Sequence, residues 1–223
     1  NMRSKDGLSG FLKRDESSHD IFGAGHASTS ISAALGFAHA RDWNKTEEQI
    51  IAIIGDGAMT GGIAYEGINN LGFHKTQLTI VLNDNSHSIS KSVGALSHYL
   101  NRVVTNPTYN KIRKDIWEIS GKLPMSKHIR KFMRKTEEGI KGYLTPGALF
   151  EELGLRYIGP IDGHNIDELI YTFNAIKDMN TPVLVHVYTH KGKGNKLAEK
   201  DAIKYYSLGG KKSSTNGSTV PNY

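Results

Sequence analysis

Two short apolar segments, residues 50–54 and 79–82, constrain the fold more than any other feature of the sequence. Each ends in a cluster of Gly, Asp and Asn, and a stretch with helical spacing, residues 62–71, lies between them. A strand, a helix and a second strand over so short a length form a βαβ unit, which implies parallel strands and a right-handed crossover. The segment therefore predicts an α/β fold with a mostly parallel sheet.

Further elements of the same kinds follow along the chain. The first residues are polar and rich in glycine, which predicts irregular structure. Helical spacing and apolar runs beyond them predict helices over residues 28–41, 146–153 and 166–179 and strands over residues 155–158 and 181–189. We therefore expect a three-layer α/β/α sandwich in one domain over residues 1–200, with residues 201–223 as a linker toward a second domain.

Composition narrows the class of protein. The 223 residues include no cysteine, which rules out disulfides and thiolate metal sites and favours a reducing compartment. No apolar run approaches the roughly 18–20 residues that a membrane span needs. The first residues also lack the apolar segment of a signal peptide. These features predict a globular protein with enough Ile, Leu, Val and Phe for a core, and without a membrane partner.

The net charge of +6 is concentrated in one stretch. Residues 102–141 contain eleven Lys and Arg against four Asp and Glu, in a pattern that suggests two amphipathic helices. We interpret the stretch as a solvated helical excursion from the domain. The alternative is a nucleic-acid-binding module, which predicts steeply salt-dependent affinity for DNA or RNA. That alternative is weakened by the few aromatic residues in the stretch and the lack of a known motif.

The ends of the first two predicted strands carry side chains suited to a metal ion. Asp56 lies in a Gly-Asp-Gly turn after the first strand, and Asn85 follows the second. A carboxylate and an amide oxygen at one sheet edge suit Mg²⁺, which takes few protein ligands and completes its shell with phosphate oxygens and water. We expect the helix after Gly57 to aim its N-terminus at the same place, as an anion site.

The pair "GDG" and Asn resembles the signature of thiamine-diphosphate enzymes. The sequence on either side of this pair resembles one family within that group, the 1-deoxy-D-xylulose-5-phosphate synthases. The resemblance rests on "DGLSGFLKRDESSHDIFGAGHASTSISAALGFAHA", "IIGDGAMTGGIAYEGINN", "VLNDNSHSIS", "RKTEEGIKG", "PGALFEELGLRYIGPIDGHN" and "HKGKG", in that order. Transketolases and 2-oxo acid dehydrogenases share the cofactor signature but lack "DGLSGFxKRxES" and "GPxDGH".

The resemblance implies a transferase that depends on thiamine diphosphate and Mg²⁺. Its reaction would decarboxylate pyruvate and join the two-carbon unit to D-glyceraldehyde 3-phosphate. The product, 1-deoxy-D-xylulose 5-phosphate, would feed isoprenoid, thiamine and pyridoxal phosphate synthesis. The resemblance further implies a homodimer in the cytoplasm, or in the plastid stroma if the source is a eukaryote.

The resemblance also assigns roles to individual residues. Three would provide ligands to Mg²⁺, through the Asp56 carboxylate, the Asn85 side chain and the backbone carbonyl of His87. His26 is the candidate catalytic residue. The residues expected to contact the cofactor are Gly25, His26, Ala27, Gly57, Ala58, Asn85, Lys191 and Asn195.

The chain departs from the family pattern in two places and in its extent. Asn195 replaces a tyrosine that contacts the cofactor, and Tyr206 stands near the substrate where the family has histidine. These changes leave open a different thiamine-diphosphate transferase with an altered acceptor. The family's cofactor-activating glutamate lies on a second domain, which we expect after residue 223. The chain would then supply the metal and diphosphate half of the site, either as a fragment or as one subunit of a split enzyme, and would be inactive alone.

Two other motifs carry less weight. A dinucleotide-binding interpretation of "GAGHAS" fails because Ser28 stands where the third glycine belongs and no strand precedes the loop. His164, in "IDGH", could be an acid–base or metal-binding group. A single histidine directly after a strand is more typical of a residue that fixes a turn, and we prefer that interpretation.

Overall fold

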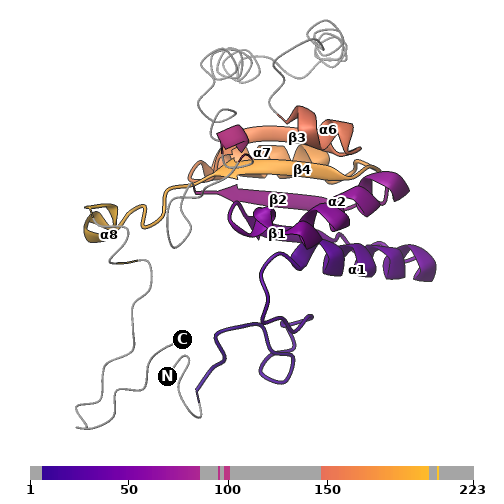
Figure 1. Cartoon of the computed structure of the whole chain (residues 1–223), viewed down its shortest axis with the longest axis horizontal. Helices are drawn as coiled ribbons and strands as arrows, with labels where there is room; N and C mark the ends of the chain where they lie inside the picture. The colour runs from indigo at the N-terminus through magenta and orange to yellow at the C-terminus, as the bar shows by residue number, and fades with distance from the viewer. Residues whose placement is uncertain (1–6, 86–94, 96–97, 101–146, 201–204, 206–223) are drawn as a thin grey trace, which may run out of the picture. The chain divides into compact units, whose positions relative to one another are not determined.

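The computed structural model describes residues 7–85, 95, 98–100, 147–200 and 205 (Figure 1). Four sequence predictions lie outside these residues: the third metal ligand at His87, the basic stretch 102–141, Tyr206 and, apart from residue 205, the linker over residues 201–223. The chain divides into two compact units. One is His26–His190, which contains the sheet, and the other combines Asn1–Gly25 with Lys191–Tyr223. The assignment of residues 1–200 to one domain stays a prediction.

The unit His26–His190 is built on a parallel sheet. Its strands are β1 (Ile51–Gly55), β2 (Thr79–Asp84), β3 (Arg156–Asp162) and β4 (Val183–Tyr188), in the order β1-β2-β4-β3. Every neighbouring pair is parallel, so the carboxyl ends of all four strands lie along one edge. The predicted βαβ unit and parallel sheet are confirmed.

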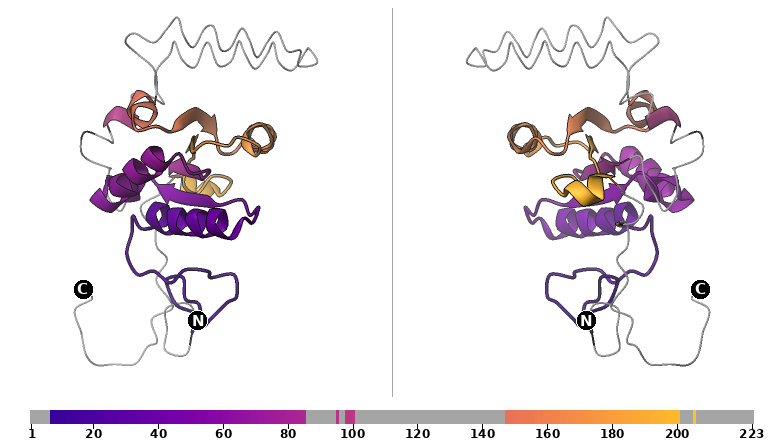
Figure 2. Two further views of the ribbon diagram at one scale, coloured as in Figure 1. Left: turned by 90° about the vertical axis from the view of Figure 1, so that its right-hand side faces the viewer. Right: turned by 90° about the vertical axis from the view of Figure 1, so that its left-hand side faces the viewer.

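Helices cover both faces of the sheet. One face packs against α1 (Ser30–Asn44), α2 (Gly62–His74) and the short α6 (Ala148–Glu152), through a core that includes Ile31, Ile68 and Phe150. The other face packs against α7 (Ile166–Ile176), where Val183, Val185 and Val187 of β4 are buried. Figure 2 shows α2 and α6 on one side of the strands and α7 on the other. The predicted α/β/α layering is therefore confirmed.

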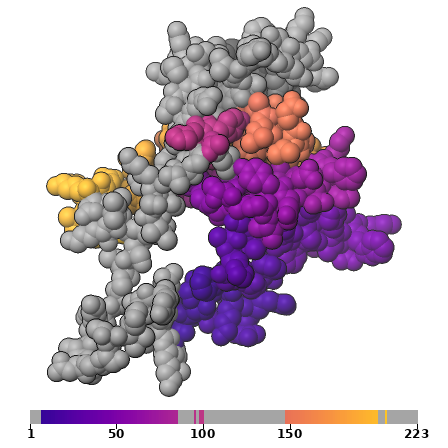
Figure 3. Space-filling view, in the orientation of Figure 1, coloured from indigo at the N-terminus to yellow at the C-terminus, as the bar shows by residue number. Residues whose placement is uncertain are grey.

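Glycines in α2 allow this helix to pack closely against its neighbours. A Cβ at Gly67 would approach Ser32 and Ile31 of α1, and a Cβ at Gly72 would collide with the backbone oxygen of Leu153. Helix α2 therefore contacts α1 on one side and the turn after α6 on the other. In the space-filling view, the orange atoms of the α6 region lie next to the purple atoms of the α2 region (Figure 3).

Two short elements were not predicted from the sequence. Helix α2 begins at Gly62, as predicted, but Gly57 is followed first by a single 3-10 turn, η1 (Ala58–Thr60), which ends because the backbone of Gly61 is extended, with φ −73° and ψ 137°. The unpredicted helix α8 (Lys196–Lys200) lies just after "HKGKGN". Among the described residues, no helix is both long and apolar enough to cross a bilayer.

Candidate metal and cofactor site

Asp56 and Asn85 lie at the ends of two neighbouring strands. β1 and β2 pair in the register Gly55 to Asn83, and the Asp56 backbone N–H donates to the Asn83 carbonyl at 3.2 Å. The Asp56 side chain is nearly buried, with 7% of its residue surface exposed. Asn85 is half-buried and follows directly after β2. Strand pairing therefore brings the two predicted metal ligands to the same edge of the sheet.

The donor set at this edge fits Mg²⁺. A carboxylate and an amide oxygen are hard ligands, and Mg²⁺ keeps several positions for water and phosphate rather than requiring a full protein cage. Over the described ranges, 7–85 and 147–200 with the short pieces between them, there is no group of three or more His, Cys, Asp or Glu residues that could hold a metal ion.

The turn after Asp56 presents backbone donors beside the carboxylate. Gly57 opens the 3-10 turn with helical φ −63° and ψ −42°. The first N–H groups of such a turn have no carbonyl within it to bond, which suits them to an anion such as diphosphate. Ser28, with a left-handed φ of 73°, donates from Oγ to the Ala58 carbonyl at 2.6 Å and so anchors this turn to the loop before α1.

The remaining predicted cofactor residues divide between the two units. His26 and Ala27 are exposed in the loop before α1, in the unit that holds the sheet. Gly25, Lys191 and Asn195 belong to the other unit. In that unit the Asn195 Oδ1 accepts from the N–H groups of Leu197 (3.0 Å) and Ala198 (3.3 Å), at the start of α8. The roles assigned to these residues stay predictions.

A buried chain of polar side chains next to Asn85 was not predicted from the sequence. It consists of Asp84, His186 and Tyr157, which we call the buried relay. The Asp84 Oδ2 lies 3.1 Å from His186 Nε2, and His186 Nδ1 lies 2.7 Å from the Tyr157 hydroxyl. His186 has no exposed surface, and Asp84 and Tyr157 have only 3% and 9%. The signal in the sequence was a lone histidine in the apolar run "VLVHVY", which must find partners when buried.

Thr189 fixes the same strand end from β4. Its backbone N–H donates to the Asp84 carbonyl and its hydroxyl donates to Asn83 Oδ1, both at 2.8 Å. The Asn83–Asn85 segment is thus bonded to the turn after β1 on one side and to the end of β4 on the other. The residues before the predicted metal ligand have little freedom to move.

His164 has the turn-fixing contacts expected of it. Its Nε2 accepts from the backbone N–H of His190 at 2.8 Å, and its own N–H donates to Asp162 Oδ1 at 2.9 Å. The two imidazole rings stack at 6.2 Å with an interplanar angle of 4°. Because Nε2 already accepts this hydrogen bond, His164 links the segment after β3 to the segment after β4.

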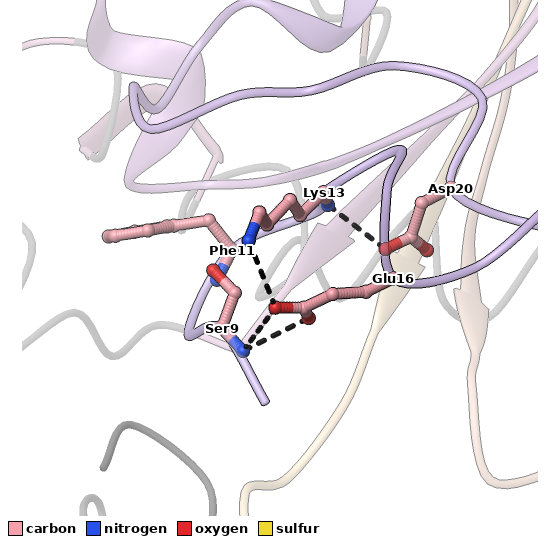
Figure 4. Close-up of polar contacts among 5 residues, drawn as sticks. All are labelled: Ser9, Phe11, Lys13, Glu16 and Asp20. Atoms are coloured by element: carbon pink, nitrogen blue, oxygen red, sulfur yellow. Dashed lines mark hydrogen bonds and ion pairs between the residues drawn. The ribbon is translucent and has the colours of Figure 1, made fainter. Parts of the chain in front are cut away.

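The loop that contains "GLSGFLKRDES", residues 7–17, is held together by its own side chains (Figure 4). The Glu16 carboxylate accepts from the Ser9 N–H at 3.1 and 3.0 Å and pairs with Lys13 Nζ at 3.7 Å. The Lys13 N–H donates to Asp20 Oδ2 at 3.0 Å, and the Phe11 N–H to Ser9 Oγ at 3.2 Å. The polar residues of this motif therefore determine the shape of the loop.

Comparison with known proteins agrees with the fold and with the motifs. Residues 1–189 match the family described as 1-deoxy-D-xylulose-5-phosphate synthase. The chain is 50% identical over 208 residues to the 1-deoxy-D-xylulose-5-phosphate synthase of Syntrophus aciditrophicus, covering 93% of this chain and 32% of that protein. It is 49% identical to the enzyme of Clostridium beijerinckii, again over 208 residues, which are 93% of this chain and 34% of that protein.

A solved structure supports the fold alone. The transketolase of Campylobacter jejuni superposes with a TM-score of 0.54 at 19% identity, covering 81% of this chain and 22% of that one. The chain spans about a third of the length of its curated relatives. The family match covers most of its residues, and the sheet is parallel, as the strand–helix–strand pattern predicted. The chain therefore belongs to the 1-deoxy-D-xylulose-5-phosphate synthase family.

Proposed function

We propose that this chain holds Mg²⁺ and the diphosphate group of thiamine diphosphate for the condensation of pyruvate with D-glyceraldehyde 3-phosphate. The products are 1-deoxy-D-xylulose 5-phosphate and CO₂. The observation that carries the proposal is the placement of Asp56 and Asn85 on paired strand ends, beside the turn that begins at Gly57. The family to which the chain belongs is named for this product.

Each residue of the edge has a distinct part in this proposal. The Asp56 carboxylate supplies a negatively charged oxygen to Mg²⁺, and Asn85 supplies a neutral one. Backbone N–H groups of Gly57 and Ala58 donate to the diphosphate, and Lys191 adds a positive charge. When bound, thiamine diphosphate supplies the carbon nucleophile that carries the two-carbon unit. His26, on the exposed loop before α1, donates or accepts a proton at the reacting atoms.

Other features of the function go with this proposal. The chain spans about a third of the length of its relatives. We therefore assign the rest of the active site to the remaining two thirds of that length. These 223 residues by themselves would then turn over no pyruvate. The complete enzyme would be a homodimer in the cytoplasm, or in the plastid stroma of a eukaryote, and would supply isoprenoid, thiamine and pyridoxal phosphate synthesis. Size-exclusion chromatography with light scattering, and imaging of a fluorescent fusion, test assembly and location.

A matched pair of substitutions tests the metal site. Asp56→Asn and Asp162→Asn make the same chemical change at the ends of two strands of one sheet, β1 and β3. Isothermal titration with thiamine diphosphate and Mg²⁺ should show saturable binding to the wild-type chain and to Asp162→Asn. Binding to Asp56→Asn should be lost, because the Mg²⁺ loses its negatively charged ligand. Equal affinity of all three proteins would contradict the proposal, as would a wild-type chain that binds nothing.

A further inference from the structure

We propose that the buried relay of Asp84, His186 and Tyr157 is a positioning device for the metal ligand Asn85. The inference rests on the proposed function, since it concerns the same Mg²⁺ site. It names three positioning residues on three different strands. None of them is expected to touch the metal or the cofactor.

One neutral tautomer of His186 satisfies every hydrogen bond of the relay. The Asp84 carboxylate can only accept, so His186 must carry its proton on Nε2, 3.1 Å away. His186 Nδ1 is then an acceptor, and the Tyr157 hydroxyl donates to it at 2.7 Å. Among the described residues, no buried side-chain nitrogen or oxygen lacks a hydrogen-bond partner. The relay is therefore fully satisfied in a single arrangement, which is the condition under which a buried polar network rigidifies its surroundings.

The location of the relay argues against a role in stability alone. The other interior residues of β4, from Val183 to Val187, are apolar, and an apolar residue in place of His186 would continue that pattern. Apolar packing often stabilises a core as well as a buried polar network does. What the polar chain adds is geometric specificity, because its hydrogen bonds have preferred lengths and directions and apolar contacts do not.

The relay acts on Asn85 through the backbone. Asp84 precedes Asn85 directly, and its side chain is held by β4 through His186, which is in turn held by β3 through Tyr157. The Tyr157 ring is itself fixed by stacking on Phe150 of α6, at 6.0 Å and 3°. A lost bond at any point allows Asp84, and with it the Asn85 side chain, to leave the position set by the strand end. Outer residues that orient metal ligands commonly change metal affinity by about 10–100-fold.

Nuclear magnetic resonance of ¹⁵N-histidine-labelled protein tests the relay without any ligand. We expect His186 to be the Nε2–H tautomer, with a slowly exchanging Nε2 proton shifted downfield by the Asp84 carboxylate. In Tyr157→Phe the Nδ1 resonance should move while the Nε2–H signal persists. A wild-type His186 with its proton on Nδ1, or a rapidly exchanging ring proton, would overturn the proposal.

Metal binding tests the positioning role itself. Tyr157→Phe removes one hydroxyl at the far end of the relay and keeps the stacked ring. The control is Leu71→Ala, which opens a cavity in α2 away from this edge, since α2 runs back from the end of β1 toward the start of β2. Titration with thiamine diphosphate and Mg²⁺ should show affinity for Tyr157→Phe weakened by about tenfold or more. Leu71→Ala should be less stable and yet bind like the wild type.

Two further variants separate the possible failures. Asp84→Asn keeps an oxygen that accepts from His186 Nε2, so its affinity should lie closer to the wild type than that of Asp84→Ala. If Asp56→Asn abolishes binding while Tyr157→Phe and Asp84→Ala bind as the Leu71→Ala control does, the relay is structural only and this inference fails alone. If Asp56→Asn also binds normally, or the wild type does not bind, the proposed function fails and the inference fails with it.

Discussion

The end of β2 and the N-terminal loop use the same kind of bond in opposite surroundings. At the end of β2 the Asp84 carboxylate pairs with His186, and these residues are 3% and 0% exposed. In the loop the Glu16 carboxylate accepts from the Ser9 N–H and pairs with Lys13, whose side chain is 55% exposed. A carboxylate in water loses little when its partner is removed, whereas a buried one is left uncompensated. The comparison predicts a rigid strand end at β2 and an easily rearranged loop.

The largest expected effect comes from removing the centre of the relay. His186→Phe leaves the Asp84 carboxylate and the Tyr157 hydroxyl buried without their partner. A buried group left without its hydrogen-bond partner costs about 1–3 kcal/mol of unfolding free energy, and a charged carboxylate costs more, so the two losses together exceed the cost of removing either end of the relay. Urea denaturation followed by circular dichroism measures the loss. A cost below about 1 kcal/mol would mean that the relay bonds contribute as little as exposed ones.

Removing one end of the relay should cost less. Tyr157→Phe deletes only the hydroxyl, and the ring keeps its stacking on Phe150. One buried acceptor, His186 Nδ1, then lacks its donor, at a cost of about 1–3 kcal/mol. The same urea experiment applies, with Tyr65→Phe on the half-buried surface of α2 as the matched control. Equal stability of the two variants would show that the hydroxyl in the relay contributes nothing special.

The equivalent change in the loop should hardly alter global stability. Glu16→Ala removes both acceptors of the Ser9 N–H and the ion pair with Lys13. We expect a loss below about 1 kcal/mol, because the groups released are hydrated. Hydrogen exchange should nevertheless speed up at the Ser9 amide while the amides of β2 keep their protection. Faster exchange in β2 would break the contrast between the two regions.

The smallest expected effect is at an exposed acid before β1. The pKa of Glu48 is lowered mainly by a hydrogen bond from the Thr46 side chain. A hydrogen bond from the backbone of Glu48 itself lowers it further, and the Arg41 charge makes a weaker contribution. A lowered pKa in the folded state favours folding above the ordinary pKa, and that contribution is lost as the pH falls through the folded-state pKa. Thr46→Ala should raise the pKa of Glu48 toward its ordinary value, as measured by NMR titration. An unchanged pKa would contradict the assigned cause.

Local pattern was enough to predict the layers of this fold and the edge that carries the candidate site. The pattern of residues 50–85 predicted both strands and their connecting helix, because apolar runs and glycine clusters depend on local structure alone. The 3-10 turn at Ala58 was missed, since a helical start and one tight turn begin with the same residues. The buried relay was missed because Asp84 and His186 lie 102 positions apart, and only the pairing of β2 with β4 brings them together.

The most direct measurement is an anomalous-scattering map from crystals grown with Mn²⁺ and thiamine diphosphate. Mn²⁺ takes the same oxygen ligands as Mg²⁺ and gives a signal that identifies the ion. The account predicts a strong peak at the ends of β1 and β2, bonded to the Asp56 carboxylate and to the Asn85 side-chain oxygen, with diphosphate oxygens completing its shell. A peak elsewhere on the sheet edge, or an ion that contacts neither residue, would contradict it.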